Sequence, residues 1–328
     1  MNSLHRRRFL QAAVATVTAA GFGSEILAGQ QTSPGGIPTR PLGKSGQQVS
    51  IVGLGGYHIG TIEEPLAISL MHEAIDGGMR FFDNSWDYNQ GRSEEYMGKA
   101  LATGGRRQQV FLMTKVCARD YEGAKQQLDE SLRRLRTDVI DLWQFHEINW
   151  DIDSQWLYER GALRAAEEAR TAGKVRFIGF TGHKDPSHQL KMLATPFAWD
   201  TVQMPISVLD AHYRSFQKLV LPQCVDRQIA VLGMKSLSNG IIPRELNLPA
   251  EVCRRFALSL PITSLMCGIK SHENLRQDLA MAQNFQPITG DDVDELLAQT
   301  ADAGRDGKLE PHKTTRYGSA YHFRQHGE

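Results

Sequence analysis

The segment VFLMTKVCARDYEGAKQQLDESLRRLRTDVIDLWQFH, residues 110–146, contains the pattern that decides the fold. It begins with an apolar run, Val110–Thr114, and ends with a second one, Val139–Phe145. Between the two runs, leucines recur three and four residues apart, which is the spacing of one face of a helix. A strand, an amphipathic helix and a second strand in this order predict a βαβ unit with parallel strands.

The same alternation extends along the chain in both directions. The apolar runs that we predict to be strands are eight in number: Val52–Leu54, Met79–Phe82, Val110–Thr114, Val139–Phe145, Val175–Phe180, Thr201–Met204, Ala230–Met234 and Thr263–Cys267. Eight parallel strands, each followed by a helix, close into a (β/α)8 TIM barrel, here predicted as one α/β domain. A doubly wound open sheet is the alternative, but no GxGxxG turn opens a helix after the first strand.

Composition narrows the class of protein. The chain has 328 residues, 41% of them hydrophobic, and its 37 basic residues equal its 37 acidic ones. These values are typical of a soluble globular protein and argue against the clustered basic face that nucleic-acid binding needs. The four cysteines form no CxxC pair, so neither a disulfide framework nor a zinc ribbon is predicted.

The first thirty residues have a different character from the rest. The run Arg6-Arg7-Arg8-Phe9-Leu10 is followed by an apolar stretch, Ala12–Phe22, that is too short to span a bilayer comfortably. The run resembles a twin-arginine export signal. We therefore predict a signal peptide at residues 1–30, ahead of a barrel with a C-terminal tail at residues 31–328.

This signal implies the twin-arginine translocase as a partner, no stable membrane insertion, and a periplasmic or exported location. Because that route carries folded proteins, it suits a protein that takes up a cofactor before export. An accidental basic terminus and an uncleaved amphipathic anchor are the alternatives. Removing residues 1–30, which hold three arginines and one glutamate, leaves a body with a charge of about −2.

Four polar residues are predicted to meet at one end of the barrel. Asp83, Lys115 and His146 each follow directly on, or end, a predicted strand, and Tyr88 lies in the loop after Asp83. The carboxyl ends of barrel strands lie side by side and carry the chemistry of such folds. We therefore expect a carboxylate, an ammonium, a phenol and an imidazole to share one pocket.

These four groups suit proton transfer to a carbonyl oxygen. The ammonium of Lys115 is expected to lower the phenol pKa of Tyr88, which is ordinarily about 10, so that Tyr88 can act as an acid. Asp83 would orient Lys115, and His146 would hydrogen-bond the substrate oxygen. The set contains no source of electrons, so a hydride-carrying cofactor is implied.

At these residues the chain resembles the aldo-keto reductases. The resemblance lies in three segments: Phe82-Asp83-Asn84-Ser85-Trp86-Asp87-Tyr88-Asn89-Gln90-Gly91-Arg92-Ser93-Glu94, then Met113-Thr114-Lys115, then Leu132 to His146. It implies that Asp83, Tyr88, Lys115 and His146 are catalytic. It also implies reduction of an aldehyde or ketone by NADPH, or the reverse alcohol or sugar oxidation, with Tyr88 as proton donor; NAD is a possible substitute.

The resemblance also indicates where the cofactor would bind. The positions carried over are Thr181, Gln203, Met234, Lys235, Gly268, Lys270 and Asp278. Gln203 matches one of the family's nicotinamide contacts. Thr181-Gly182-His183 stands where the family usually has Ser-Asn; Thr181 can still hydrogen-bond, whereas Gly182 has no side chain to do so. Met234 replaces an aromatic residue, Lys270 suits a 2′-phosphate, and Asp278 replaces an asparagine.

The substrate and two competing functions stay open at this point. The aromatic loop residues Tyr57, His58, Trp86 and Trp150 are candidates for the pocket wall, and the tail after Lys308 is expected to fold over the barrel mouth. His322 and His326 are interpreted as part of a polar tail rather than as a metal pair, and Cys117 as a packed thiol. An exported cofactor-binding or sensor barrel without turnover is the alternative function. A metal-dependent hydrolase is disfavoured because no His-x-His follows the first strand.

Overall fold

The computed structural model describes residues 31–328, and the signal peptide predicted for residues 1–30 lies outside them. Eight parallel strands form a closed barrel in the order β10-β3-β4-β5-β6-β7-β8-β9. They are β3 (Val52–Gly55), β4 (Phe81–Asp83), β5 (Phe111–Val116), β6 (Ile140–Phe145), β7 (Val175–Thr181), β8 (Thr201–Pro205), β9 (Ala230–Met234) and β10 (Ser264–Gly268). The predicted (β/α)8 barrel is confirmed, and the open-sheet alternative is wrong.

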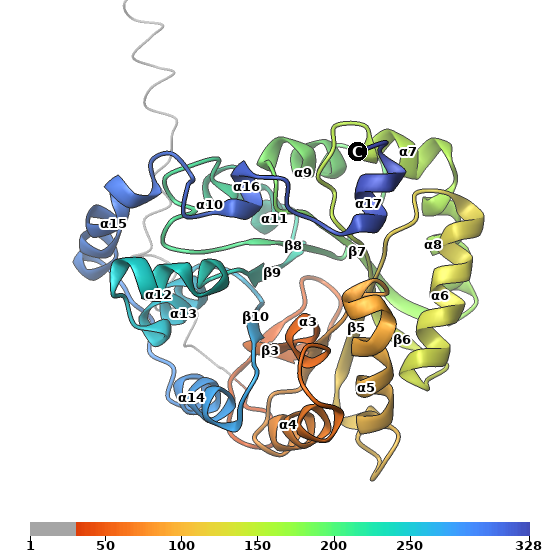
Figure 1. The fold of residues 1–328 in the computed structure, drawn as a ribbon, viewed down its shortest axis with the longest axis horizontal. Helices are drawn as coiled ribbons and strands as arrows, with labels where there is room; N and C mark the ends of the chain where they lie inside the picture. Colours follow the sequence, from red (N-terminus) through yellow and green to blue (C-terminus); the bar gives the residue numbers. More distant parts are fainter. Residues whose placement is uncertain (1–30) are drawn as a thin grey trace, which may run out of the picture.

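Helices surround this barrel on the outside (Figure 1). Those of at least eight residues are α4 (Glu64–Asp76), α5 (Arg92–Leu101), α6 (Tyr121–Leu135), α8 (Ala162–Thr171), α9 (Pro186–Leu193), α13 (Ala250–Ser259), α14 (His272–Gln283) and α15 (Asp291–Gly304). Shorter ones are α3 (Gly56–Ile59), α7 (Asp153–Glu159), α10 (Phe216–Leu219), α11 (Leu221–Asp226), α12 (Ile241–Leu246), α16 (Pro311–Thr314) and α17 (Ala320–Gln325), with 3-10 turns η1 (Tyr88–Gly91), η2 (Arg107–Gln109) and η3 (Ser238–Gly240). Within residues 31–328, no helix has the length and apolar character to cross a membrane.

The β5–α6–β6 unit shows how local sequence produces this arrangement. All six residues of β5 and all six of β6 are buried, as expected for strands covered on both faces. The Asp120 side chain caps α6 by accepting a hydrogen bond from the Gly123 amide at 2.8 Å. The helix ends at Arg136, whose φ of 53° is left-handed. The strands pair so that Lys115 lies beside Gln144, which brings their carboxyl ends to the same level.

A two-stranded antiparallel sheet that sequence reasoning did not anticipate lies at the amino end of the barrel. It consists of β1 (Thr39–Pro41) and β2 (Gln48–Ser50). Leu42 and Val49 pack into an apolar cluster with residues such as Phe81 and Phe111, the first residues of β4 and β5. The Arg40 guanidinium donates hydrogen bonds of 2.6 and 2.8 Å to carbonyls just ahead of β10. This end of the barrel is therefore closed by hydrocarbon.

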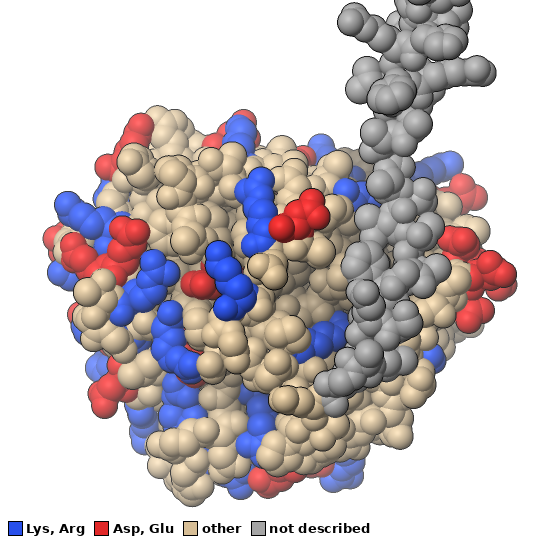
Figure 2. Space-filling view, turned by 180° about the vertical axis from the view of Figure 1, so that it is seen from behind, with Lys and Arg blue, Asp and Glu red and all other residues tan. Residues whose placement is uncertain are grey.

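The reverse side of the molecule carries Lys and Arg interspersed with Asp and Glu, rather than gathered into one basic surface (Figure 2). On the opposite side, the C-terminal tail crosses the carboxyl ends of the strands (Figure 1). The tail is fastened at Lys313, which is fully buried and whose Nζ lies 2.7 Å from Asp210 Oδ1 and donates to the Tyr213 carbonyl at 2.8 Å. The tail thus forms part of the barrel mouth.

Candidate active site

The four residues predicted to meet at the barrel mouth do lie together. Lys115, on β5, is almost fully buried; its Nζ contacts the Asp83 carboxylate and donates to the Asn84 carbonyl at 2.7 Å. The same nitrogen lies 3.3 Å from Tyr88 Oη, at the start of η1. The His146 ring meets the Tyr88 ring edge-on, with 5.4 Å between centroids. A carboxylate, an ammonium and a phenol therefore form one hydrogen-bonded chain, with an imidazole beside it.

The pKa of Tyr88 differs from the sequence-based expectation. Burial raises the phenol pKa well above its usual value, and the negative charges of Asp83, Asp87 and Glu147 add to that rise. The ammonium of Lys115 does not reverse the shift because the Asp83 carboxylate already compensates its charge. Tyr88 therefore keeps its proton at neutral pH and can donate it only to an oxygen on which negative charge is developing.

His146 is held by two residues whose roles sequence reasoning missed. Its Nδ1 lies 3.0 Å from Asp87 Oδ1 and 3.0 Å from Ser85 Oγ, and Ser85 in turn donates to Asp87 at 2.5 Å. Burial by itself would raise the pKa of the Asp87 carboxyl, but the charge and hydrogen bond of His146 hold it well below its usual range. The Asp87 carboxylate and the Ser85 hydroxyl orient the ring. Both residues stand between Asp83 and Tyr88 in the sequence, and this position could have indicated that they belong to the site.

Two polar side chains next to the tetrad mark the adjoining face of the pocket. Thr181 and Gln203 are neighbours across β7 and β8, and both are buried. Gln203 Nε2 donates to Asp83 Oδ2 at 3.2 Å, whereas its Oε1 makes no hydrogen bond within residues 31–328. A buried amide oxygen without a donor is costly, and a ligand amide N–H would satisfy it.

Positive charge gathers on the next part of the mouth. Lys235, after β9, and Lys270, after β10, flank His58, whose ring lies against Gly268 so closely that a side chain at 268 would overlap it. Burial and the charges of Lys270, Lys235 and Arg254 lower the pKa of His58 to about 4. This cationic rim is suited to phosphate groups.

Comparison with known proteins identifies the fold family. The family model described as the aldo/keto reductase family matches residues 51–255, which is more than half of the chain. The chain belongs to the aldo/keto reductase family. As a member, it is an NAD(P)-dependent oxidoreductase by class.

Relatives agree with this family assignment, and a solved structure shares the fold. The oxidoreductase YqkF of Bacillus subtilis is 29% identical over 278 residues, covering 80% of this chain and 83% of that protein. The aldo-keto reductase yakc [NADP(+)] of Schizosaccharomyces pombe is 27% identical over 66% of this chain and 65% of its own length. Among structures, the holo form of aldo-keto reductase AKR11C1 from Bacillus halodurans aligns with a TM-score of 0.67 at 23% identity, covering 82% of this chain and 100% of that one.

The residues of this reductase fit a nicotinamide dinucleotide. Gln203 and Thr181 lie beside the tetrad, where an amide would meet the free Gln203 Oε1. Met234 ends β9, and Lys235 follows it directly in the sequence, so both lie at the barrel mouth. Lys270 is exposed at the rim of this mouth. Lys235 Nζ also lies 3.2 Å from Tyr317 Oη of the tail, so it joins the rim to the tail.

Asp278 occupies a different position from the other candidate cofactor residues. It is buried in α14 and forms an ion pair with Arg254 of α13, beside a cavity between these two helices. The carboxylate therefore neutralises Arg254 rather than facing open solvent.

Glu147, which the sequence did not single out, connects the barrel mouth to the C-terminal tail. Glu147 directly follows His146 with a left-handed φ of 50°, and its Oε1 lies 3.3 Å from His183 Nε2. Its Oε2 accepts the backbone N–H of Ser319 at 2.9 Å. Burial would raise the pKa of Glu147, but the hydrogen bond from His183 and the charges of His322 and His146 lower it to about 2. A charged carboxylate therefore anchors the tail next to the tetrad.

The aromatic candidates for the pocket wall divide into two groups. Tyr57 is 53% exposed and its ring meets Tyr88 edge-on at 5.5 Å, so it flanks the approach to the phenol. Trp86 and Trp150 instead contact the tail: Trp86 meets Tyr321 at 5.3 Å, and Trp150 stacks on His326 at 4.0 Å.

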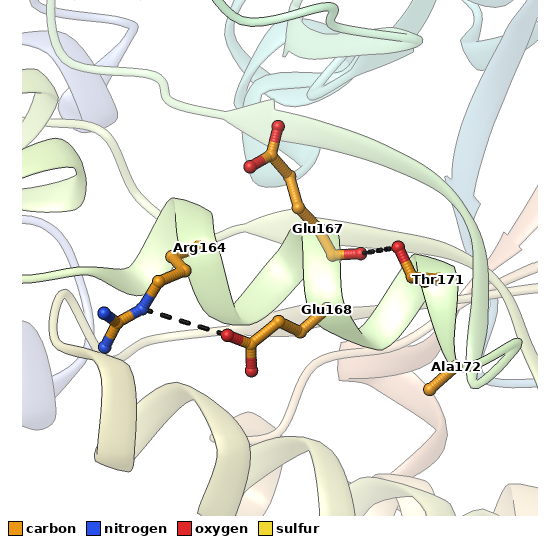
Figure 3. Close-up of a pocket in the computed structure, with 5 residues that line it drawn as sticks. All are labelled: Arg164, Glu167, Glu168, Thr171 and Ala172. Atoms are coloured by element: carbon orange, nitrogen blue, oxygen red, sulfur yellow. Dashed lines mark hydrogen bonds and ion pairs between the residues drawn. The ribbon is translucent and has the colours of Figure 1, made fainter.

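A separate hollow on the outer surface of α8 has no connection with this chemistry. It is lined by Arg164, Glu167, Glu168, Thr171 and Ala172 (Figure 3). Two interactions within the helix lie there: Arg164 pairs with Glu168 at 3.9 Å, and Thr171 donates to the Glu167 carbonyl at 2.9 Å.

Proposed function

We propose that this protein is an exported, NADP(H)-dependent reductase of an aldehyde or ketone, able to run the reverse oxidation of an alcohol or sugar. The observation that supports it most strongly is the contact chain from Asp83 through Lys115 to Tyr88 Oη, with His146 beside the phenol. This arrangement can hold one proton ready and stabilise the anion left when that proton departs.

A bound nicotinamide would supply the hydride that the carbonyl carbon needs. Tyr88 donates its phenolic proton to the carbonyl oxygen as negative charge builds there. Lys115, 3.3 Å from Oη, stabilises the phenolate that forms, and Asp83 keeps Lys115 charged and directed at it. His146 hydrogen-bonds the same oxygen through Nε2, because Asp87 and Ser85 occupy Nδ1.

The proposed preference for NADP(H) rests on charge. Lys235 and Lys270 place positive charge around His58 at the mouth. A 2′-phosphate adds negative charge that such a rim would attract. Lys270→Glu is therefore expected to weaken NADPH binding more than NADH binding in a fluorescence titration, and equal weakening of both would argue against this preference.

The proposed location is periplasmic or otherwise exported, through the twin-arginine translocase. The run Arg6-Arg7-Arg8-Phe9-Leu10 supports it. Replacing Arg6 and Arg7 with lysine is expected to hold the protein in the cytoplasm. Unchanged export would remove the twin-arginine route from the proposal.

Tyr88→Phe tests the reaction itself. We expect turnover of an aldehyde panel with NADPH to disappear, while NADPH binding, followed by fluorescence, stays near normal because the ring is retained. Tyr57→Phe is the matched control, since it removes the hydroxyl of a tyrosine that touches Tyr88 but not Lys115. Turnover that survives in Tyr88→Phe, or a purified protein that binds no nicotinamide dinucleotide, would refute the proposed function.

A further inference from the structure

Three side chains of types that can ligate a metal meet at His146. Cys117 follows β5, His146 follows β6, and His322 comes from α17 in the tail. One potential ligand atom from each lies within 4.8 Å of the other two, and all three residues are buried. The cluster therefore joins two barrel strands to the C-terminal tail.

The spacing suits a single ion with a small coordination shell. A tetrahedral zinc ion has Zn–S bonds of about 2.3 Å and Zn–N bonds of about 2.0 Å, so adjacent sulfur and nitrogen ligands lie roughly 3.5 Å apart. Cys117 Sγ lies 3.7 Å from His146 Nδ1. Movements of tenths of an ångström would bring Cys117 Sγ and His146 Nδ1 to the separation of two ligands of one zinc ion.

His322 supplies an independent indication of a missing ligand. Its side chain is fully buried, yet neither ring nitrogen makes a hydrogen bond within the described part of the chain. The nearest carboxylate oxygen, Glu147 Oε2, lies 3.7 Å from Nε2, beyond hydrogen-bonding distance. Buried imidazole nitrogens normally have a hydrogen-bond partner or a metal ion. A neutral imidazole is a common metal ligand, so a metal ion would supply the partner that His322 lacks.

The charges around the cluster also favour a cation. The Asp87 carboxylate lies 3.0 Å from His146 Nδ1. A thiolate at Cys117 together with Asp87 would balance the two positive charges of a divalent ion. The Cys117 thiol must lose its proton when a metal binds, because the thiolate is the ligand.

We propose that Cys117, His146 and His322 form a binding site for one thiophilic divalent cation, of which Zn²⁺ is the best match, and that the bound ion ties α17 to the barrel. Bonds form from the metal to Sγ and to two imidazole nitrogens. The protons of Cys117 Sγ and His146 Nδ1 pass to solvent, and no electron is transferred. Thiolate and imidazole ligands together are typical of zinc sites.

Occupancy would switch the reductase off, a consequence that rests on the proposed function. The metal takes Nδ1 of His146 from Asp87 and Ser85, which orient the ring towards the carbonyl oxygen. It also fixes the tail over the mouth, where Tyr317 and Lys235 meet. Zinc would therefore act as an inhibitor from a site distinct from Tyr88.

Titration of the purified mature chain with Co²⁺ tests the site without any assay of turnover. We expect one equivalent to bind and to produce thiolate-to-cobalt charge-transfer absorption together with intense tetrahedral visible bands. Cys117→Ser should abolish the charge-transfer band. His322→Gln should weaken Zn²⁺ binding by at least about tenfold, since even residues that only support metal ligands cost on the order of 10- to 100-fold.

Matched controls come from the same chain. Cys224→Ser removes another buried thiol that lies outside the cluster, and His312→Gln removes another buried tail histidine without hydrogen-bond partners in residues 31–328. Both should bind Co²⁺ like the parent protein. Thermal unfolding checks that Cys117→Ser is folded; Cys117→Ala, which adds no buried hydroxyl, serves if it is not.

The proposal fails if no equivalent of Co²⁺ binds, or if the charge-transfer band persists in folded Cys117→Ser or Cys117→Ala. Its regulatory part fails if Zn²⁺ inhibits His322→Gln as strongly as the parent. A protein that binds Co²⁺ through Cys117 but reduces no aldehyde would reject the proposed function and leave the metal site standing.

Discussion

The two ends of the barrel differ in what is buried there: apolar side chains at the amino end and charged side chains at the carboxyl end. At the amino end, β1 and β2 cover an apolar cluster that includes Phe81 and Phe111, so water is excluded mainly by hydrocarbon. At the carboxyl end, buried charges such as Lys115 and Asp83 are excluded from water by the loops and the tail. Hydrocarbon burial stabilises the fold directly, whereas buried charges need precise partners and in return supply chemistry. Damage to the two ends should therefore have different consequences.

Lys115→Met should show the largest effect at the carboxyl end. It removes the group that stabilises the Tyr88 phenolate and leaves the Asp83 carboxylate without its cation. We expect turnover to fall by roughly 10²- to 10⁴-fold, the range for losing acid–base assistance. Steady-state kinetics with an aldehyde and NADPH would check this, and a loss below tenfold would contradict the assigned role.

Phe81→Ala should show the reverse pattern at the amino end. Phe81 is fully buried in the apolar cluster and touches no member of the tetrad in the contacts described above. We expect a loss of about 3–5 kcal/mol in the free energy of unfolding, measured by denaturant titration, because a cavity replaces the ring. Turnover at a temperature where the variant is folded should stay near the parent value; a large loss there would erase the contrast between the ends.

Glu147 allows the carboxyl end to be tested through pH. Its pKa is lowered from 4.5 to about 2 in the folded protein, chiefly by His183 against the effect of burial. The stabilisation of the charged carboxylate, on the order of 3 kcal/mol, is fully present above about pH 4.5 and disappears as the pH falls through about 2. In Glu147→Gln, the free energy of unfolding should therefore fall less than in the parent as the pH is lowered. An equal fall in both proteins would show that Glu147 is not held charged.

Asp87→Asn should have the smallest effect of the four. The carboxylate orients His146 without touching the reacting oxygen, and an amide keeps its shape but not its charge. We expect a fall in kcat on the order of 10²-fold, as for a misplaced catalytic group, with little change in NADPH binding. If kcat is unaltered, Ser85 alone suffices to position the ring.

The eight strands and the tetrad were predictable because the information is local. Each strand is an apolar run bounded by turn residues, and Asp83, Lys115 and His146 fall at or just after the ends of such runs. The predicted boundaries differ slightly: the run beginning at Met79 enters the barrel only at Phe81, because the Met79 amide still donates to Ala74 at the end of α4.

Other parts depend on contacts between residues far apart in the chain. The β1–β2 sheet is anchored through Arg40 to carbonyls more than two hundred residues away. The Glu147–Ser319 hydrogen bond and the contact of Cys117 and His146 with His322 join the barrel to a tail over a hundred residues later. No spacing pattern in the sequence indicates these contacts.

The sequence by itself determined the barrel and the four polar residues at its mouth, since periodicity and strand ends are local properties of the chain. Only the tertiary structure decided how those groups behave. Burial beside Asp83, Asp87 and Glu147 raises the Tyr88 pKa that Lys115 was expected to lower, because electrostatics sums over every nearby charge and over the loss of water. Closure of the tail likewise brought His322 to Cys117 and His146, and that proximity exists only in three dimensions.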